Sequence, residues 1–335
     1  MLGAHDSPLS PSEPVTGPHV AVVSGGVGAA RFLRGLCDVV APDEIAAIVN
    51  TGDDTVLHGL SISPDLDTIT YTLAGAIDPE RGWGLAGETW QAMAALARYA
   101  EARPPTSAAA ATWFNLGDRD LATHLYRTAR LAEGATPTDI ADEIRRAWGI
   151  GVRLLPMTDG RQATMIELAS GEEVSFQDYF VRLRHSVPVR AVRFAATDAT
   201  PTPAVVDALE HAATIVIAPS NPIVSIGPIR ALPGVEDVLG RRRDDVVAVS
   251  PIVGGAALKG PADHMLSELG HEPSVVGVAR LYAPIASRLV IDPVDAPLAG
   301  AVAAAGIVPL VQPSIMSSPP LAADLARATI GATSR

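Results

Sequence analysis

Short continuous runs of apolar residues recur along the chain, and most of them stop at Pro, Gly, Asn or Asp. This pattern is typical of buried strands in a parallel sheet. We predict six such strands, at residues 19–24, 45–50, 214–218, 246–250, 288–291 and 308–311. The first is followed by glycines and then by a helical stretch from Ala29 to Val39, the opening of a nucleotide-binding α/β unit.

The stretch 154–195 has a different pattern. Thr164–Leu168 and Glu173–Phe176 flank Ser170 and Gly171, which predicts a β-hairpin. The predicted fold class is therefore α/β, with a Rossmann-like parallel sheet core and a smaller inserted α/β domain. We expect the core to comprise 18–153 and 196–335, with 154–195 forming part of the inserted domain. Residues 1–17 are rich in Pro and Ser without periodicity, which predicts a disordered extension.

Composition and charge narrow the functional classes. The chain has 335 residues, of which 48% are hydrophobic and only 4% aromatic, as expected for parallel strands alternating with Ala-rich helices. A net charge of −12 argues against a nucleic-acid partner, because basic residues cluster densely only at 241–243. No apolar run approaches the roughly 20 residues of a membrane span, and no signal peptide opens the chain. We predict a cytoplasmic protein with no membrane partner.

A glycine-rich turn, Ser24-Gly25-Gly26-Val27-Gly28, lies between the first strand and the first helix. Small residues there let backbone N–H groups and the helix N-terminus face a phosphate. The turn is not a complete dinucleotide fingerprint, because Arg31 occupies the place of the third glycine. A plain tight turn is the alternative, and an NAD-dependent oxidoreductase is disfavoured.

Four carboxylates, those of Asp53, Asp54, Asp65 and Asp67, follow the second strand within fifteen positions. Carboxylates beside phosphates repel unless a metal ion intervenes, and Mg²⁺ uses one or two carboxylates together with phosphate oxygens. Asp53 and Asp67 are the predicted direct ligands. The alternative is that Asp65 or Asp67 only caps the helix that continues into Ile69–Leu73.

A second polar cluster, Leu116-Gly117-Asp118-Arg119-Asp120, opens another helical stretch, with His124 and Arg127 on the same face. Arg119 could clamp a phosphate or carboxylate through two hydrogen bonds. Equally, Asp118 or Asp120 caps the helix and Arg119 pairs with one of them.

The turn after the predicted strand at 214–218 reads Pro219-Ser220-Asn221-Pro222. In open α/β sheets ligands bind at the carboxyl ends of the strands, so Ser220 and Asn221 could contact a base edge. A rigid exit from the strand is the alternative.

The ordered set of motifs resembles the phosphoenolpyruvate and 2-phospho-L-lactate transferases of coenzyme F420 biosynthesis, especially their actinobacterial branch. The resemblance spans nearly everything from residue 19 onward. Its most specific motifs are L-G-D-R-D-L-A-T-H at 116–124 and P-S-N-P at 219–222, joined by S-G-G-V-G at 24–28, V-N-T-G-D-D at 49–54, S-P-D-L-D-T at 63–68, I-D-P-E-R-G-W-G at 77–84 and S-P-I-V-G at 250–254.

This resemblance implies a homodimeric enzyme acting on small molecules, with Mg²⁺ as cofactor. It would transfer a phosphoenolpyruvyl or 2-phospholactyl group from a guanosine pyrophosphate donor to the deazaflavin Fo, releasing GMP. The implied residues form four sets: metal ligands Asp53, Asp67 and Asp65; catalytic residues Asp53, Asp67 and Arg119; donor-binding residues Gly25, Gly26, Gly28, Ser220, Asn221 and Pro222; and Fo-binding residues Asp67, Asp118 and Arg119. The sequence does not distinguish an enolpyruvyl from a lactyl donor. The main alternative is a non-catalytic, nucleotide-sugar-binding regulatory protein of the same superfamily.

Overall fold

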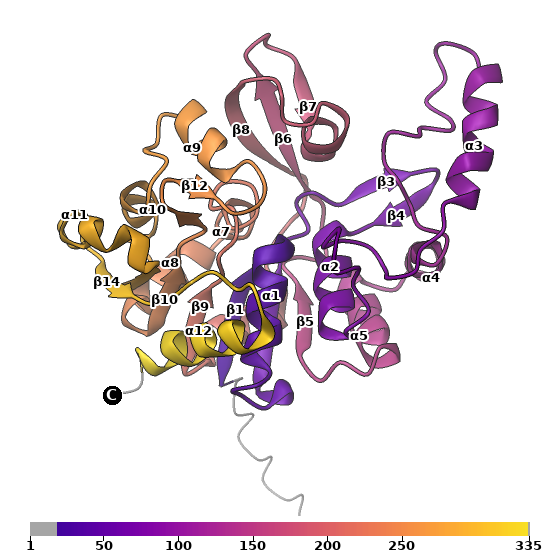
Figure 1. The fold of residues 1–335 in the computed structure, drawn as a ribbon. Helices are drawn as coiled ribbons and strands as arrows, with labels where there is room; N and C mark the ends of the chain where they lie inside the picture. The colour runs from indigo at the N-terminus through magenta and orange to yellow at the C-terminus, as the bar shows by residue number, and fades with distance from the viewer. Residues whose placement is uncertain (1–18, 334–335) are drawn as a thin grey trace, which may run out of the picture.

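A seven-stranded parallel sheet forms the core of the computed structural model, which describes residues 19–333 (Figure 1). The extension predicted at 1–17 lies outside the described residues. The strand order is β14-β13-β10-β9-β1-β2-β5, and all neighbours pair in parallel. The strands are β1 (Val20–Ser24), β2 (Ile45–Val49), β5 (Arg153–Pro156), β9 (Thr214–Ile217), β10 (Val246–Val249), β13 (Arg288–Ile291) and β14 (Val308–Val311). The six predicted strands are confirmed, and the edge strand β5 is an addition.

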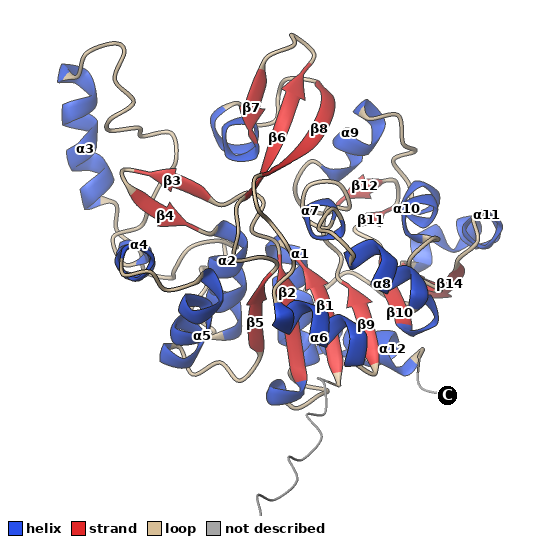
Figure 2. Cartoon of the chain, turned by 180° about the vertical axis from the view of Figure 1, so that it is seen from behind, coloured by secondary structure: helices blue, strands red, loops and turns tan. Residues whose placement is uncertain are grey.

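Helices cover both faces of this sheet, because alternate residues of each strand point into two separate cores. Val20 and Val22 of β1 pack into one core, whereas Ala21 and Val23 pack into the other. The first core is covered by α1 (Gly26–Leu36), α2 (Pro64–Leu73), α5 (Pro137–Ala147) and α12 (Pro319–Gly331). The second is covered by α6 (Pro203–His211), α7 (Gly227–Arg230), α8 (Val235–Arg241), α9 (Ala262–Glu268), α10 (Val275–Tyr282) and α11 (Ala299–Ala304). Figures 1 and 2 show the two layers from opposite sides.

A smaller antiparallel sheet stands beyond the carboxyl ends of the core strands, in the order β7-β6-β8 (Figure 2). Its strands are β6 (Gln162–Leu168), β7 (Glu173–Ser175) and β8 (Val189–Ala196). The antiparallel pairing of β6 with β7 confirms the predicted hairpin. Residues 154–156 of the range predicted for the inserted domain pair in the main sheet as β5, because they run parallel to β2. The domain boundary itself stays a prediction.

A second projection lies beside the smaller antiparallel sheet (Figure 1). It consists of β3 (Thr55–Leu57), β4 (Leu60–Ile62), α3 (Gln91–Ala102) and α4 (Asp120–Ala132). β3 and β4 are joined by His58 and Gly59, both with positive φ, as a two-residue hairpin turn requires. A further hairpin joins β11 (Ile252–Val253) and β12 (Ala256–Ala257). Among residues 19–333, no helix is long and apolar enough to cross a membrane.

The contact between α1 and α12 depends on Gly35. A Cβ atom at this position would lie 2.3 Å from the backbone carbon of Ala322, closer than atoms can approach. The absence of a side chain therefore lets the last helix pack directly on the first one.

We predict that Gly35→Ala lowers the free energy of unfolding by about 2 kcal/mol, because the backbones of α1 and α12 must separate. Gly300→Ala is the matched control: nothing lies within 4 Å of its added Cβ, and it sits in a helix. The control should be neutral or stabilising by about 0.5 kcal/mol. Urea denaturation measures both, and equal effects of the two substitutions would contradict the packing argument.

Candidate functional site

The turns that follow β1 and β9 meet where the strand order reverses direction. From β1 the sheet continues through β2 in one direction, and from β9 through β10 in the other. The Ser220 hydroxyl accepts a hydrogen bond from Gly25 N at 3.3 Å and donates one to Gly25 O at 2.7 Å. Such a reversal creates the crevice in which open α/β sheets bind ligands. The structure thus brings together two segments of the predicted donor site that are 195 residues apart.

The glycines of the first turn allow this close approach. A Cβ at Gly28 would lie 2.1 Å from the carbonyl oxygen of Pro219. Gly26 has φ of +69°, a conformation that favours glycine. Helix α1 begins here, and Gly25 offers it no side-chain cap. The turn is therefore shaped by packing and also leaves the start of α1 facing the crevice.

Asn221 stabilises its own turn. Its Oδ1 accepts hydrogen bonds from Ile223 N at 2.9 Å and Val224 N at 3.3 Å. Its amide lies 3.7 Å from the sulfur of Met265. These contacts match the alternative of a rigid strand exit, and a role for Asn221 and Pro222 in donor binding stays a prediction.

Two buried carboxylates share one amide group beside the glycine turn. Asn50 Nδ2 donates to Asp53 Oδ1 at 2.9 Å and to Asp65 Oδ2 at 3.0 Å. Gln177 adds longer contacts to Asp53, and the backbone of Gly26 hydrogen-bonds Asp65. Both side chains are less than one tenth exposed. The structure therefore joins Asp53 with Asp65 at the edge where the glycine turn lies.

The charge of this pair is not balanced by the protein. Among residues 19–333, no Lys or Arg forms a hydrogen bond or ion pair with Asp53 or Asp65. Burial, and then the proximity of Asp65, raise the pKa of Asp53 well above its ordinary value. Burial likewise raises the pKa of Asp65 to about 6. Two uncompensated carboxylates beside the glycine turn are a donor set that suits Mg²⁺.

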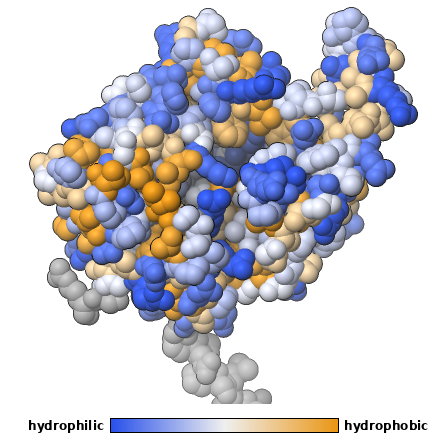
Figure 3. Space-filling model, in the orientation of Figure 1, coloured by the Kyte–Doolittle hydropathy of each residue, from blue (hydrophilic) through white to orange (hydrophobic). Residues whose placement is uncertain are grey.

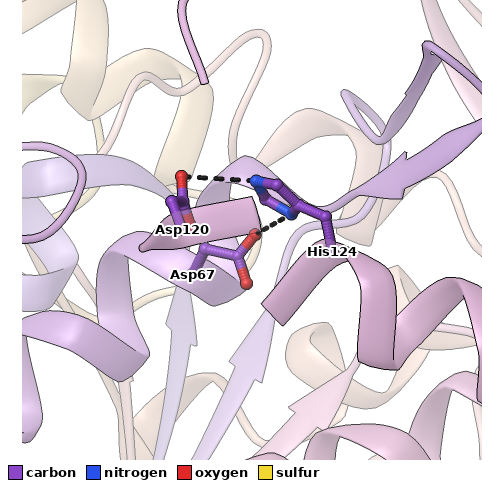
Figure 4. A group of neighbouring side chains, drawn as sticks. All are labelled: Asp67, Asp120 and His124. Atoms are coloured by element: carbon purple, nitrogen blue, oxygen red, sulfur yellow. Dashed lines mark ion pairs between the residues drawn. The ribbon is translucent and has the colours of Figure 1, made fainter. Parts of the chain in front are cut away.

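Asp67 belongs to a different group of side chains (Figure 4). Its carboxylate forms a two-point ion pair with the buried guanidinium of Arg127. His124, which is 1% exposed, lies between Asp67 at 3.7 Å and Asp120 at 3.3 Å. Tyr71 donates a hydrogen bond to Asp120 at 2.5 Å. Asp67, Asp120 and His124 could together bind a metal ion, although Arg127 already neutralises Asp67.

A cavity of about 260 Å³ opens beside this second group, between the β3–β4 hairpin, α2, α4 and α5. Asp54 and Arg127 line it together with apolar side chains from those elements. Ser63 donates a hydrogen bond to Asp54 at 2.7 Å. The cavity therefore has a mostly apolar wall with a few charged groups, a composition typical of small-molecule pockets.

Asp118 and Arg119 take part in a reciprocal capping arrangement. The Asp118 carboxylate accepts hydrogen bonds from the backbone N–H groups of Gln91 and Ala92, at 2.9 and 3.0 Å, at the start of α3. In return, Glu88 accepts from the N–H groups of Arg119 and Asp120, at 2.8 and 2.9 Å, at the start of α4. This is close to the structural alternative considered for the cluster, with Asp118 capping α3 instead of its own helix.

The Arg119 side chain is exposed and donates to the Ala86 carbonyl at 2.5 Å. It forms no ion pair with a carboxylate among residues 19–333. Contacts of Asp118 and Arg119 with a substrate stay predictions.

The sequence did not single out Asn50, Glu88 and Gln177 as residues of the site. Asn50 directly follows β2 and lies three positions before Asp53, and an amide at that position could have been recognised as a partner for the carboxylate. Glu88 and Gln177 carry no local signal, because their partners lie 31 and 124 positions away.

Comparisons with known proteins show which family the chain is similar to. A family model described as 2-phospho-L-lactate transferase CofD matches residues 20–300. A protein named phosphoenolpyruvate transferase from Nocardia farcinica is 40% identical, and the match covers 94% of each chain. Proteins of the same name from Kitasatospora aureofaciens and Streptomyces coelicolor are 41% and 42% identical over 93% and 92% of this chain and 96% of theirs.

The solved structure of a UPF0052 family member from Bacillus halodurans has a similar fold. It superposes with a TM-score of 0.60 at 14% identity, covering 94% of this chain and 99% of the other. At that identity the similarity confirms the α/β fold alone.

We predict that Asp65→Asn changes how stability depends on pH in the presence of EDTA. The pKa of Asp65 is about 6 in the folded protein and near 3.8 in the unfolded chain, so deprotonation costs more in the folded state. The free energy of unfolding should therefore fall as the pH rises from about 4 to about 6. The variant should gain up to roughly 3 kcal/mol over the unsubstituted protein across this range.

Urea denaturation at several pH values measures the difference, with the exposed Asp324→Asn as control. A difference that stays constant from about pH 4 to about pH 7 would contradict the raised pKa.

A second prediction concerns the reciprocal caps. Asp118→Ala should speed amide hydrogen exchange in the first turn of α3 by roughly fivefold, because two N–H groups lose their acceptor. Exchange in α5, which has its own capping box at Thr136 and Asp139, should not change. If α3 exchanges at the original rate, Asp118 is free for another role.

Proposed function

The chain belongs to the 2-phospho-L-lactate transferase CofD family, and from that premise we propose its reaction. It transfers a phosphoenolpyruvyl group, or a 2-phospholactyl group, from a guanosine pyrophosphate donor to the deazaflavin Fo. The names of the relatives from Nocardia farcinica and Streptomyces coelicolor favour the enolpyruvyl donor. The observation that carries the proposal is the uncompensated pair Asp53 and Asp65 beside the glycine turn, at the carboxyl ends of β1 and β9.

The reaction exchanges one phosphorus–oxygen bond for another. The terminal ribityl hydroxyl of Fo forms a bond to the phosphorus nearest the three-carbon acid, and the bond from that phosphorus to the bridging oxygen breaks. GMP leaves with the bridging oxygen, and the hydroxyl proton passes to a carboxylate of the site. The products are dehydro coenzyme F420-0, or coenzyme F420-0 from the lactyl donor, and GMP. Little covalent chemistry falls to the protein, so its work is to position both substrates and to balance charge.

The donor phosphates are proposed to lie against Gly25, Gly26 and Gly28 at the start of α1. The hydrogen bonds between Ser220 and Gly25 hold the β9 turn beside this position. Backbone N–H groups at a helix N-terminus attract anions without adding a charged side chain. The arrangement orients the pyrophosphate toward Asp53 and Asp65.

Asp53 and Asp65 are the residues that fit Mg²⁺ best, since their charge is unbalanced and Asn50 holds both carboxylates. Bound there, Mg²⁺ would supply positive charge that neutralises phosphate oxygens as the pyrophosphate bond breaks. The sequence pointed instead to Asp53 with Asp67. Because Arg127 already pairs with Asp67, we assign to Asp67 the role of orienting the acceptor in the crevice.

The acceptor is proposed to bind beside Asp67, Asp118 and Arg119. The cavity lined by Arg127, the partner of Asp67, supports an acceptor pocket on this side of the site. The homodimer and the cytoplasmic location expected from the resemblance and the sequence belong to the same proposal.

We predict that Asp53→Asn lowers turnover roughly a hundredfold or more, because the metal-binding charge is halved. Formation of GMP and of the deazaflavin product with Mg²⁺ measures the loss, and Mn²⁺ binding followed by electron paramagnetic resonance measures the metal site separately. Asp324→Asn, an exposed carboxylate on α12, should retain full activity and metal binding.

Retention of Mn²⁺ binding in Asp53→Asn, with its loss in Asp120→Asn, would move the metal site to Asp67, Asp120 and His124. Saturable binding of Fo, followed by its fluorescence and responsive to GDP, tests the substrates directly. Binding of a UDP-sugar without binding of Fo would instead support the regulatory alternative.

A further inference from the structure

Lys259 is the only lysine in the chain, and all the other residues in its Lys and Arg count are arginines. It lies in the exposed loop between β12 and α9. A Cβ atom at Gly82 would lie 2.7 Å from the Lys259 ammonium nitrogen and 3.8 Å from a methyl group of Val27. The ammonium group therefore reaches the segment that packs against the glycine turn at the start of α1.

Arg31 follows Val27 by one turn of α1 and presents a second cation to the same place. It is near enough to Lys259 to lower the pKa of the ammonium group, an effect that adds to a larger one from partial burial. Neither Lys259 nor Arg31 forms a hydrogen bond or an ion pair with another residue among residues 19–333. In contrast, Arg34, the next arginine on this helix, donates to the carbonyl of Thr72 at 3.1 Å.

Two neighbouring cations without partners are unusual in an acidic protein of net charge −12. Carboxylates are abundant, and other arginines use them: Arg81 pairs with Asp78 at 2.9 Å, for example. Neighbouring like charges repel each other, and an anion bound between them offsets that repulsion. The arrangement is therefore complementary to an anionic ligand.

The surface that Lys259 contacts is held in place by its own interactions. Gly82 N donates to the Asp78 carbonyl at 2.8 Å, and Gly82 adopts φ of +73°. The neighbouring Arg81 guanidinium lies 5.4 Å from the ring centres of both Trp83 and Trp90. Cation–π contacts of this kind stabilise the loop conformation. Figure 3 shows hydrophilic side chains gathered in the hollowed centre of the face on which α1 lies.

We propose that Lys259 and Arg31 bind the phosphates of the donor nucleotide beside the glycine turn. The identity of that nucleotide as a guanosine diphosphate ester rests on the proposed function. The pair of cations itself rests on the approach of Lys259 to Gly82, which also lies beside Val27, and on the absence of acidic partners in residues 19–333. Lysine and arginine supply donors that match phosphate oxygens, in addition to the backbone N–H groups of α1.

Amine labelling tests the proposal without relying on activity. Because Lys259 is the only lysine, an N-hydroxysuccinimide ester can modify only this side chain and the α-amino group, and peptide mass resolves the two. We expect GDP and inorganic pyrophosphate to slow labelling of Lys259, whereas guanosine, which lacks phosphate, does not. Labelling unaffected by either phosphate compound would overturn the proposal.

Variants provide a second measurement. Lys259→Ala and Arg31→Gln should each weaken GDP binding by roughly tenfold, the effect of losing one hydrogen bond to a charged group, while guanosine binds as before. Lys259→Arg should restore most of the affinity. Arg98→Gln, which removes an exposed charge on α3, is the matched control. Calorimetry gives the affinities, and circular dichroism verifies that each variant is folded.

The two proposals fail in different ways. If pyrophosphate protects Lys259 but GDP does not, the cation pair binds phosphate and the guanosine donor is wrong. If Lys259→Ala and Arg31→Gln both bind GDP as tightly as the unsubstituted protein does, the proposed guanosine donor is supported. The role of the two cations in binding it is then refuted.

Discussion

The carboxylates of Asp53 and Asp65 lie side by side in the interior without a protein cation to balance them. Burying like charges is unfavourable, and one amide from Asn50 offsets only part of the cost. Such a pair persists because the surrounding sheet and helices determine the positions of both residues. The glycine turn at the start of α1 lies directly beside this concentration of negative charge.

The topology of the sheet explains how distant segments meet there. Strands β1, β2 and β9 end at one edge, so the turns that carry Gly25, Asp53 and Ser220 are neighbours despite their separation in sequence. Helix α2 returns to that edge and brings Asp65. The helical turn that follows β7 contributes Gln177 to the same edge. The edge therefore joins segments that are 195 positions apart, and a ligand bound there would be stabilised only by the folded core.

The sequence predicted the sheet well because buried parallel strands leave a local signal. The runs at 19–24 and 246–250 are continuous and apolar, and both correspond to central strands. β5 was missed because Arg153–Pro156 is short, lies at the sheet edge and ends in proline. Within the site, the sequence identified the glycine turn and the aspartates but not their partners. It grouped Asp67 with Asp53, whereas Arg127, sixty positions further on, engages Asp67. Long-range pairing of this kind depends on how helices pack and has no local signature.

The reciprocal caps at Glu88 and Asp118 close the base of the projection that carries α3. The Asp118 carboxylate, beside the start of α4, accepts from N–H groups at the start of α3, and the Glu88 carboxylate, beside the start of α3, accepts from N–H groups at the start of α4. The two ends of the segment between Glu88 and Asp118 are therefore held together. A loop whose ends are fixed together can change length at little cost to the rest of the protein. The stretch around 103–112, which contains no helix or strand, is therefore a place where a reporter domain or an affinity handle could be inserted while the crevice keeps its shape.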